Sequence, residues 1–443
     1  MRGRLAGAQA AAAAGHHAGS QYARLIDRLA GTRHRPTVAP REDRRGELNP
    51  RRNPPAVVIG GGAIAMPVAR SLGAAGVPVI ALGASADPVR FSRFRSRFVD
   101  VGAGDEAQRR ALEWLVEQAP AGSVVIPCSD HGLELIARHR DLLTERNLRP
   151  LEGNDAVTLS MLDKERTYAI ARRLGLAAPR TLTLTGRDDL DRAAEIVGFP
   201  SAVKPLHSHR FKQHFKEKAI VVHDREELEE VYRQVAQHGL EVLLTEIVAG
   251  ADDRLVAYFS YLGEHGEVLL EFVSRKLRQY PTGFGHASCA ITEWDQEVAD
   301  AGLRFLRGAG VRGLSYTEFK RDARSGELKL LECNNRITIE ALSAPYDVPL
   351  LAYNRALGRP APPLRRRWAA RLWNPAEDVQ TLIELRRRGE LTFREWARSL
   401  RPPLSFHVFR VDDPMPTIGH HWMLRRDVAR KLGSLMASRS AWS

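Results

Sequence analysis

The amino-acid sequence predicts an α/β protein that begins, after residue 55, with a doubly wound parallel sheet. Short β-branched runs at 56–59, 77–82 and 124–127 are separated by stretches with helical periodicity. Strands that alternate with helices in this way are typical of a parallel sheet covered by helices on both faces. The length of 443 residues provides for a large core and for two to four structural units.

The composition argues against several classes of protein. The three cysteines are widely spaced and odd in number, which favours a reducing compartment over a disulfide framework. No apolar stretch reaches about 18 residues, so we expect no transmembrane helix. The sequence therefore predicts a cytoplasmic protein.

The net charge of +13 suggests a nucleic-acid partner, but its distribution argues against one. Between Met1 and Pro55, eleven arginines accompany four acidic residues in a segment rich in alanine and glycine. We expect residues 1–53 to form a disordered basic leader. Later arginine runs, at 365–367 and 386–388, are explained as solvated faces. No nucleic-acid partner is expected, and an anionic membrane surface is the alternative.

The first unit, predicted at 54–152, carries a glycine turn directly after its first strand. Gly60-x-Gly62-x-x-Ala65 approximates the dinucleotide-binding fingerprint. The acidic residue that should hold the ribose is missing from the end of the second strand, and Asp87 comes late. Three interpretations stay open: an NAD(P) site, a tight turn with a structural role, and a loop that lines a substrate site.

The second unit is predicted at 153–358 and begins with a helix at 155–174, which Gly175 and Pro179 end. Further elements follow in the order strand 181–185, helix 188–197, strand 198–205, strand 219–222, helix 225–238 and strand 241–248. Lys204 ends a buried apolar strand, and a lysine there needs an anion to compensate its desolvation.

Two carboxylates, a carboxamide and a guanidinium gather further along the chain. Glu318 lies on a short apolar run, and a second run ends in Glu332-x-Asn334-x-Arg336. On neighbouring strands the oxygen ligands would suit Mg²⁺, which commonly bridges carboxylates to substrate phosphates. The arginine suits a phosphoryl group or a substrate carboxylate. The pattern therefore predicts metal-nucleotide chemistry.

The ordered set of charged residues resembles the ATP-grasp superfamily of carboxylate-amine and carboxylate-thiol ligases, in particular predicted carboligases akin to bacterial D-aspartate ligases. The resemblance covers about residues 55–358 and consists of Lys164, Lys204, Glu246, Lys276, Glu318, Glu332, Asn334 and Arg336. It implies a Rossmann-like pre-ATP-grasp domain at 54–152 and a two-subdomain ATP-grasp fold at 153–358, with an ATP lid at about 180–250. A helical tail would follow at 359–443. Surface pairing of Glu318 and Glu332 with Lys320 and Lys329 would explain single residues, but not the ordered set.

The resemblance assigns each residue to one part of an ATP site. Lys164 and Lys204 would contact the nucleotide phosphates, and Lys276 the γ-phosphate. Glu246, Ile247 and Val248 would form the hinge that reads the adenine edge, and Asp253 would reach the ribose. Glu318, Glu332 and Asn334 would bind Mg²⁺ or Mn²⁺. Arg336 would hold the acyl-phosphate or the substrate carboxylate.

The activity implied by the resemblance is an ADP-forming ligation of small molecules. A carboxylate attacks the γ-phosphate of ATP to give an acyl-phosphate, and an amine displaces phosphate to give an amide. Arg275, Arg278 and His286 are candidates for holding the second substrate, and Arg278 joins Lys276 and Arg336 as a catalytic candidate. The oligomeric state is left open, with a dimer as one option. Bicarbonate activation of the carbamoyl-phosphate or biotin-carboxylase kind, an NAD(P)-binding enzyme and a non-catalytic ATP-binding protein are the alternatives.

Two segments depart from the family pattern or lie beyond it. The loop after Lys204 is glycine-rich in many relatives, but here 207–214 contains no glycine, so imidazoles and cations would have to replace backbone donors. In the tail, tryptophans are scattered among arginine-rich helices, at Trp368, Trp373, Trp396 and Trp422. The tail is interpreted either as a helix packed onto the main body or as an interfacial helix that contacts a membrane.

Overall fold

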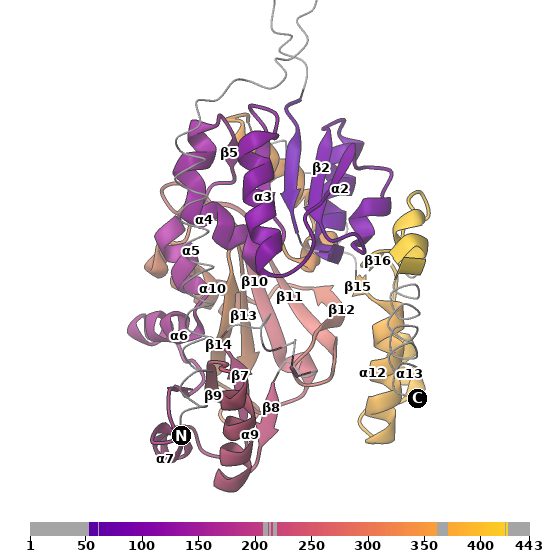
Figure 1. Cartoon of the computed structure of the whole chain (residues 1–443). Helices are drawn as coiled ribbons and strands as arrows, with labels where there is room; N and C mark the ends of the chain where they lie inside the picture. The colour runs from indigo at the N-terminus through magenta and orange to yellow at the C-terminus, as the bar shows by residue number, and fades with distance from the viewer. Residues whose placement is uncertain are drawn as a thin grey trace, which may run out of the picture.

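The computed structural model of the chain describes residues 53–60, 62–206, 211, 214–215, 219–360, 371–420 and 422–423. The predicted leader, most of the glycine-poor loop and parts of the predicted tail lie outside these residues. The described part contains three sheets, and Figure 1 shows a parallel sheet at the top, a seven-stranded sheet in the middle and a four-stranded sheet at the bottom. The α/β class that the sequence predicted is confirmed.

The N-terminal unit is a five-stranded sheet of order β3-β2-β1-β4-β5, and all its pairings are parallel. Its inner strands are buried throughout, because α2 covers one face and α3 and α4 cover the other. The bounds are β1 (Ala56–Ile59), η1 (Gly62–Ile64), α2 (Ala65–Ala74), β2 (Val79–Gly83), η2 (Pro88–Phe91), β3 (Arg97–Asp100), α3 (Asp105–Glu117), β4 (Val124–Pro127), α4 (Asp130–Glu145) and β5 (Arg149–Pro150).

The glycine turn after β1 is required by a close approach. Gly60 has a φ of 68° and a Cβ built on it would lie 2.6 Å from Ser129 Oγ, so a side chain would both strain the backbone and clash. Asp87 accepts a hydrogen bond from the Ala84 amide at 2.9 Å and closes its own turn. These contacts support the structural interpretation of the turn.

Two helices and a small antiparallel sheet follow. The helix expected at 155–174 is two helices, because Asp163 accepts a hydrogen bond from the Arg166 amide and starts a second one. The bounds are α5 (Asp155–Met161), α6 (Lys164–Arg173), β6 (Thr181–Leu184), α7 (Asp189–Val197), β7 (Ser201–Pro205), β8 (Ile220–Val222), α9 (Arg225–Gln237) and β9 (Val242–Glu246). The sheet has the order β6-β9-β7-β8 and its own hydrophobic core.

The central sheet has the order β14-β13-β10-β11-β12-β15-β16. The bounds are η3 (Asp252–Arg254), β10 (Leu255–Leu262), β11 (Val268–Tyr280), β12 (His286–Thr292), α10 (Gln296–Ala309), β13 (Gly313–Arg321), β14 (Leu328–Asn334), η4 (Ile339–Leu342), α11 (Val348–Ala356), β15 (Arg371–Trp373), α12 (Pro375–Arg387), α13 (Phe393–Ser399) and β16 (Leu404–Phe406). The expectation of a helical tail was incomplete, because β15 and β16 extend the central sheet past β12.

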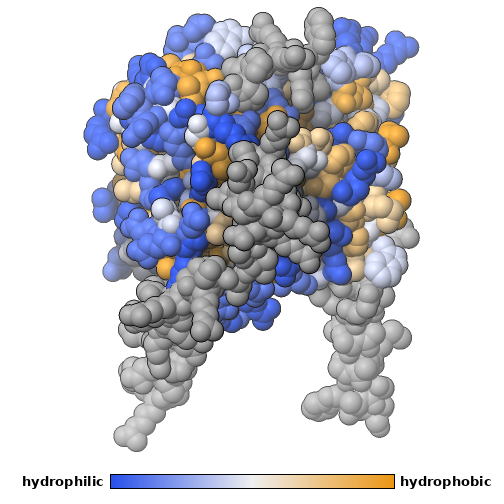
Figure 2. Space-filling model, turned by 90° about the horizontal axis from the view of Figure 1, so that it is seen from above, coloured by the Kyte–Doolittle hydropathy of each residue, from blue (hydrophilic) through white to orange (hydrophobic). Residues whose placement is uncertain are grey.

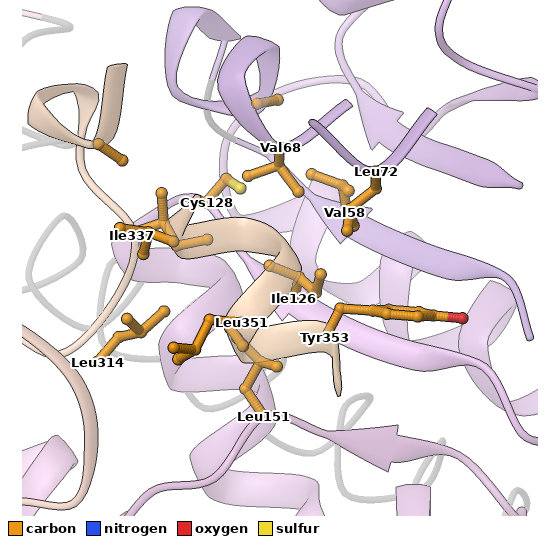
Figure 3. Packing of buried hydrophobic residues seen from close by; sticks show 14 of the residues in the cluster. Val58, Val68, Leu72, Ile126, Cys128, Leu151, Leu314, Ile337, Leu351 and Tyr353 are labelled. Carbon is orange, nitrogen blue, oxygen red and sulfur yellow. The ribbon is translucent and has the colours of Figure 1, made fainter. Parts of the chain in front are cut away.

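The N-terminal unit and the central sheet share one hydrophobic core. Figure 3 shows Val58 and Leu72 of the first unit packed in the same cluster as Leu314 and Tyr353. The hydroxyl of Tyr353 also donates a hydrogen bond to the Pro54 carbonyl at 2.6 Å. This continuous core fixes the position of the parallel sheet relative to the strands that carry the candidate site.

Candidate active site

The small sheet, the central sheet and two residues of the N-terminal unit, Ile64 and Asp130, line one cavity of about 590 Å³. This volume lies in the usual range for small-molecule sites. The lining includes most of the residues singled out in the sequence, namely Lys164, Lys204, Glu246, Ile247, Val248, Lys276, His286, Glu318, Glu332, Asn334 and Arg336. The fold therefore brings together residues that are up to 172 positions apart, from Lys164 to Arg336.

The predicted metal ligands lie on two paired strands. Glu318 of β13 is directly opposite Glu332 of β14, and like charges in such a pair repel. Asn334 donates a hydrogen bond to Glu332 at 2.9 Å. Burial raises the pKa of Glu318, and the Glu332 carboxylate raises it further, although Lys276 opposes both effects.

This donor set fits a divalent cation. The predicted ligands Glu318, Glu332 and Asn334 are two carboxylates and one amide. Among the described residues no group of three or more His, Cys, Asp or Glu side chains is placed to hold a metal ion. A cation between Glu318 and Glu332 would relieve their repulsion, and their hard oxygen atoms suit Mg²⁺. The alternative pairing with surface lysines is not what the contacts show, because Lys329 bonds to Glu246 and Asp322 instead.

Lys276 forms a buried ion pair within the cavity. Its ammonium lies 2.6 Å from the Glu318 carboxylate. The pairing between β11 and β12 shifts on both sides of Arg278, and a bulge of this kind redirects side chains. Lys276 and Gln279 both line the cavity as a result, whereas the intervening Arg278 does not.

Two further lysines line the cavity from other elements. Lys164 begins α6, and Lys204 lies in β7 with its ammonium 5.5 Å from the centre of the Phe284 ring. Burial and repulsion by Lys164 lower the pKa of Lys204 to about 8. The ion pairs between described residues do not include Lys204, so its charge is available for an anion such as a phosphate.

The predicted hinge lies at the end of β9. Glu246, Ile247 and Val248 all line the cavity. The Glu246 carboxylate accepts hydrogen bonds from Lys329 at 2.7 Å and from the Arg180 amide at 3.1 Å, so it secures the strand end. Asp253 is exposed and is not among the lining residues, and the structure does not support its predicted contact with a ribose.

Arg336 connects the strands that carry the predicted metal ligands to the N-terminal unit. It forms an ion pair with Asp130 at 2.7 Å, and Asp130 begins α4 of the N-terminal unit. Its partner keeps the pKa of Arg336 above the usual range despite burial. Arg336 is thus held at the junction of the parallel sheet and the metal-ligand strands.

Two predicted substrate residues lie elsewhere. Arg278 is buried and forms a bidentate ion pair with Asp378 of α12, at 2.7 and 2.9 Å; the prediction that it grips a substrate is wrong in this structure, because its guanidinium is already occupied. Arg275 pairs with Glu293 outside the cavity. His286 does line the cavity, and its Nε2 lies 2.6 Å from the Glu377 carboxylate.

Sequence reasoning missed two carboxylates of the cavity. Asp130 follows the carboxyl end of β4, and the rule that ligands bind at strand carboxyl ends could have found it. Glu340 is buried, lines the cavity and raises the pKa of Lys276 and Glu318 by its charge. No pattern in the sequence distinguishes Glu340, because η4 depends on tertiary packing for its position.

No protein-family model matches the chain. The D-aspartate ligase of Enterococcus faecium is 24% identical over 226 residues, which are 48% of this chain and 53% of that protein. The biotin carboxylase of Campylobacter jejuni superposes with a TM-score of 0.56 at 14% identity, over 71% of this chain and 74% of its own. The L-amino acid ligase of Bacillus licheniformis has a TM-score of 0.52 at 19% identity, over 69% and 74%.

The structural likenesses show a fold shared with these enzymes, which agrees with the fold that the sequence predicted, and the matched relatives include D-aspartate and D-alanine–D-alanine ligases. The chain spans about half the length of several curated relatives that it matches.

Proposed function

We propose that the chain is an ADP-forming ligase that activates a carboxylate with Mg·ATP and joins it to an amine. The observation that carries the proposal is the cavity that combines Glu318, Glu332 and Asn334 with Lys204. Two carboxylates and an amide suit a magnesium ion, and a lysine of lowered pKa suits a phosphate. ATP as co-substrate and Mg²⁺ or Mn²⁺ as cofactor are part of this proposal.

The chain contributes charge and position to this reaction. Lys204 and Lys164 would hold the nucleotide phosphates, and Lys276 would meet the γ-phosphate. Mg²⁺, when bound, would neutralise phosphate oxygens. Arg336, fixed by Asp130, would hold the carboxylate that attacks the γ-phosphate. An amine would then displace phosphate and give the amide.

The finer assignments belong to the same proposal. We assign 54–152 to a Rossmann-like pre-ATP-grasp domain, 153–358 to the ATP-grasp domain with its lid at about 180–250, and 359–443 to an extension. The all-parallel order of the first sheet supports the first assignment. Small carboxylates and amines are the expected partners, and a cytoplasmic location, a dimer and a peripheral membrane contact stay predictions. No helix of the described residues is long and apolar enough to cross a membrane.

A screen of ADP release tests the proposal. The purified chain with Mg·ATP is supplied with panels of carboxylates and amines, starting with D- and L-amino acids because of its relatives. ADP release that needs both a carboxylate and an amine is expected. ADP release with bicarbonate alone would favour bicarbonate activation, and Mg·ATP binding without turnover in any pair would favour a non-catalytic protein. Binding of NAD(P) with none of Mg·ATP would refute the proposal.

A pair of arginine variants provides a control for the screen. Arg336→Met should lower the rate by a factor of about 100 or more, because a positioned charge at the reacting group is lost. Arg140→Met removes a comparable ion pair with Asp155, 2.6 Å in length, outside the cavity. It should retain most of the rate. Equal losses in both variants would assign Arg336 a structural role.

A further inference from the structure

The helix α12 of the C-terminal extension lies against the hairpin formed by β11 and β12. Figure 1 shows α12 beside β12, on the right of the central sheet. This hairpin carries Lys276, Gln279 and the segment 283–287, all of which line the cavity. The extension therefore backs one wall of the candidate active site.

The contact is centred on Asp378, whose carboxylate is completely buried. One oxygen accepts hydrogen bonds from Arg278 Nε at 2.7 Å and from Ser288 at 3.0 Å. The other accepts from Arg278 Nη2 at 2.9 Å and from the indole groups of Trp373 at 3.0 Å and Trp396 at 2.7 Å. A single carboxylate thus ties together β11, β12, β15 and α13.

Other residues on the same face of α12 continue the contact toward the hairpin tip. Their spacing of three and four positions places them on one side of a helix. The hydrogen bonds join Glu377 to His286, Gln380 to Tyr280, Thr381 to the Gln279 carbonyl and Glu384 to Thr282. Both strands of the hairpin and its tip are held along the length of α12.

The wall that α12 supports faces Lys204, which the proposed function assigns to a nucleotide phosphate. Phe284, at the hairpin tip, lies against the ammonium of Lys204. The bulge in β11 turns Arg278 toward Asp378 and Lys276 toward Glu318. The directions of the Arg278 and Lys276 side chains depend on the same bulge. The Arg278–Asp378 ion pair on one face of the hairpin therefore also fixes Lys276 on the other face.

We propose that α12 is a positioning element of the site, and that Asp378 and Glu377 hold the β11–β12 hairpin so that Lys276 and Phe284 keep their places in the cavity. Neither Asp378 nor Glu377 is among the residues that line the cavity, so both act through the hairpin. The inference rests on the proposed function only in assigning a catalytic consequence to the position of Lys276.

The chain offers a matched control in a second buried Arg–Asp pair. Arg70 of α2 pairs with Asp413 of the extension at 3.0 Å, and both side chains are as buried as those of Arg278 and Asp378. Asp413 also accepts hydrogen bonds from Ser92 at 2.7 Å and from the Arg93 amide at 2.9 Å. This pair anchors the extension to the N-terminal unit, and its residues do not line the cavity.

The test compares Asp378→Asn with Asp413→Asn in the full chain. Hydrogen exchange followed by mass spectrometry reports on the peptides that cover 272–288, thermal unfolding reports stability, and steady-state kinetics with the substrates found in the screen report KM for ATP and kcat. Both variants should lose stability, since each weakens a buried ion pair. Only Asp378→Asn should speed exchange in 272–288 and lower kcat/KM for ATP by about tenfold or more.

A milder variant keeps the proposal testable if Asp378→Asn does not fold. Glu377→Gln weakens the contact with the partly exposed His286 and leaves the buried Arg278 pair intact. It should speed exchange at the hairpin tip, 281–287. It should also change KM for ATP while leaving the unfolding midpoint nearly unchanged. The exposed pair His223–Glu227 of the lid provides the matching substitution, Glu227→Gln, which should leave the hairpin unchanged.

The outcomes separate this inference from the proposed function. Unchanged exchange in 272–288 in the α12 variants, or equal losses of kcat/KM in Asp378→Asn and Asp413→Asn, would overturn the inference. Exchange needs no turnover, so it decides the structural part even if the screen finds no ligase activity. If no ligase activity is found but hydrogen exchange in the hairpin is faster in the α12 variants, the positioning role of α12 is supported and only the ligase proposal fails.

Discussion

At the scale of single residues, the charged side chains of the cavity differ in whether they have an ion-pair partner. Lys276 and Arg336 each have a carboxylate partner within 2.7 Å. Lys204 instead lies against an aromatic ring, and its pKa is lowered to about 8. A desolvated ammonium in this setting gains most from an anionic ligand, and for this reason the proposed function assigns Lys204 to a phosphate.

The first prediction concerns the protonation of Lys204. As the pH rises through about 8, the free enzyme should bind Mg·ATP more weakly, because Lys204 loses its proton. In Lys204→Arg the affinity should stay nearly constant over this range, since the guanidinium keeps its proton. Calorimetric titration at several pH values measures both curves. A wild-type curve as flat as that of the variant would contradict the prediction.

The second prediction concerns the facing carboxylates. Glu332→Gln removes one of two like charges that lie directly opposite each other, so the free protein should unfold at a higher temperature. The same change should weaken Mg²⁺ binding by a factor of about ten or more, since a carboxylate ligand becomes an amide. Thermal melts with and without Mg²⁺ measure both effects, and the exposed Glu226→Gln on α9 is the control. A stability loss without added metal would argue against repulsion between Glu318 and Glu332.

At the scale of elements, short contacts between distant strands fix the end of β9, where the predicted hinge lies. Lys329 of β14 bonds to Glu246 at the end of β9 and to Asp322 after β13, at 2.7 and 3.2 Å. All three side chains are largely buried. Burial alone would raise the pKa values of Glu246 and Asp322. Hydrogen bonds from Lys329 and from backbone amides nevertheless hold both pKa values below their ordinary range.

The third prediction follows from this cluster. Lys329→Met removes the closest cation of Glu246 and Asp322 and leaves the exposed guanidinium of Arg324, 3.6 Å from each carboxylate. We therefore expect a loss of about 3 kcal/mol in the free energy of unfolding at neutral pH. A lowered folded-state pKa gives stability that is present above the unfolded pKa and is lost as the pH falls. The wild type should therefore lose more stability than Lys329→Met between neutral and acid pH. Urea unfolding at several pH values measures the difference, and parallel curves would contradict it.

The elements were predictable to different degrees. Helical periodicity correctly located α7 and α9, the two helices that pack on the small sheet, because their apolar faces cover a single core. Periodicity could not find the break at Asp163, where a side-chain cap starts a new helix. It also missed β15 and β16, since three-residue strands are defined by the sheet edge to which they bond.

At the scale of the whole molecule, the extension concentrates exposed apolar side chains. Of the large hydrophobic residues that are exposed in the described part of the chain, Ile196, Val221 and Trp294 lie elsewhere, and the others are Val379, Ile383, Phe393, Phe409, Val411, Met415, Ile418 and Trp422. Figure 2, seen from above, shows orange side chains along the right, the side on which Figure 1 places the extension, and also on the upper left. The contacts of α12 support packing onto the main body, and membrane contact stays a prediction.

The fourth prediction tests that membrane contact. The exposed apolar groups of the extension, together with its arginines at 386–388, should bind anionic vesicles, and the binding should weaken at high salt. Sedimentation with anionic and with neutral vesicles measures it, and the double change Val411→Asp and Ile418→Asp should reduce the pelleted fraction. Equal pelleting with both kinds of vesicle, or none, would contradict an electrostatic membrane contact.

The sequence by itself determined the chemistry of the candidate site. Runs of apolar residues placed Lys204, Glu318 and Glu332 on strands, and the order of the charged residues indicated an ATP-grasp ligase. These signals are local, because strand periodicity and ligand type can be read from neighbouring positions.

Only the tertiary structure decided which charges serve the cavity. Arg278 lies two positions from Lys276, yet a bulge turns it toward Asp378, 100 residues away in sequence. Asp130 enters the site because a shared core fixes the N-terminal unit against the central sheet. The direction of a side chain at a bulge and the partner of a buried charge depend on packing between distant segments, which no local pattern records.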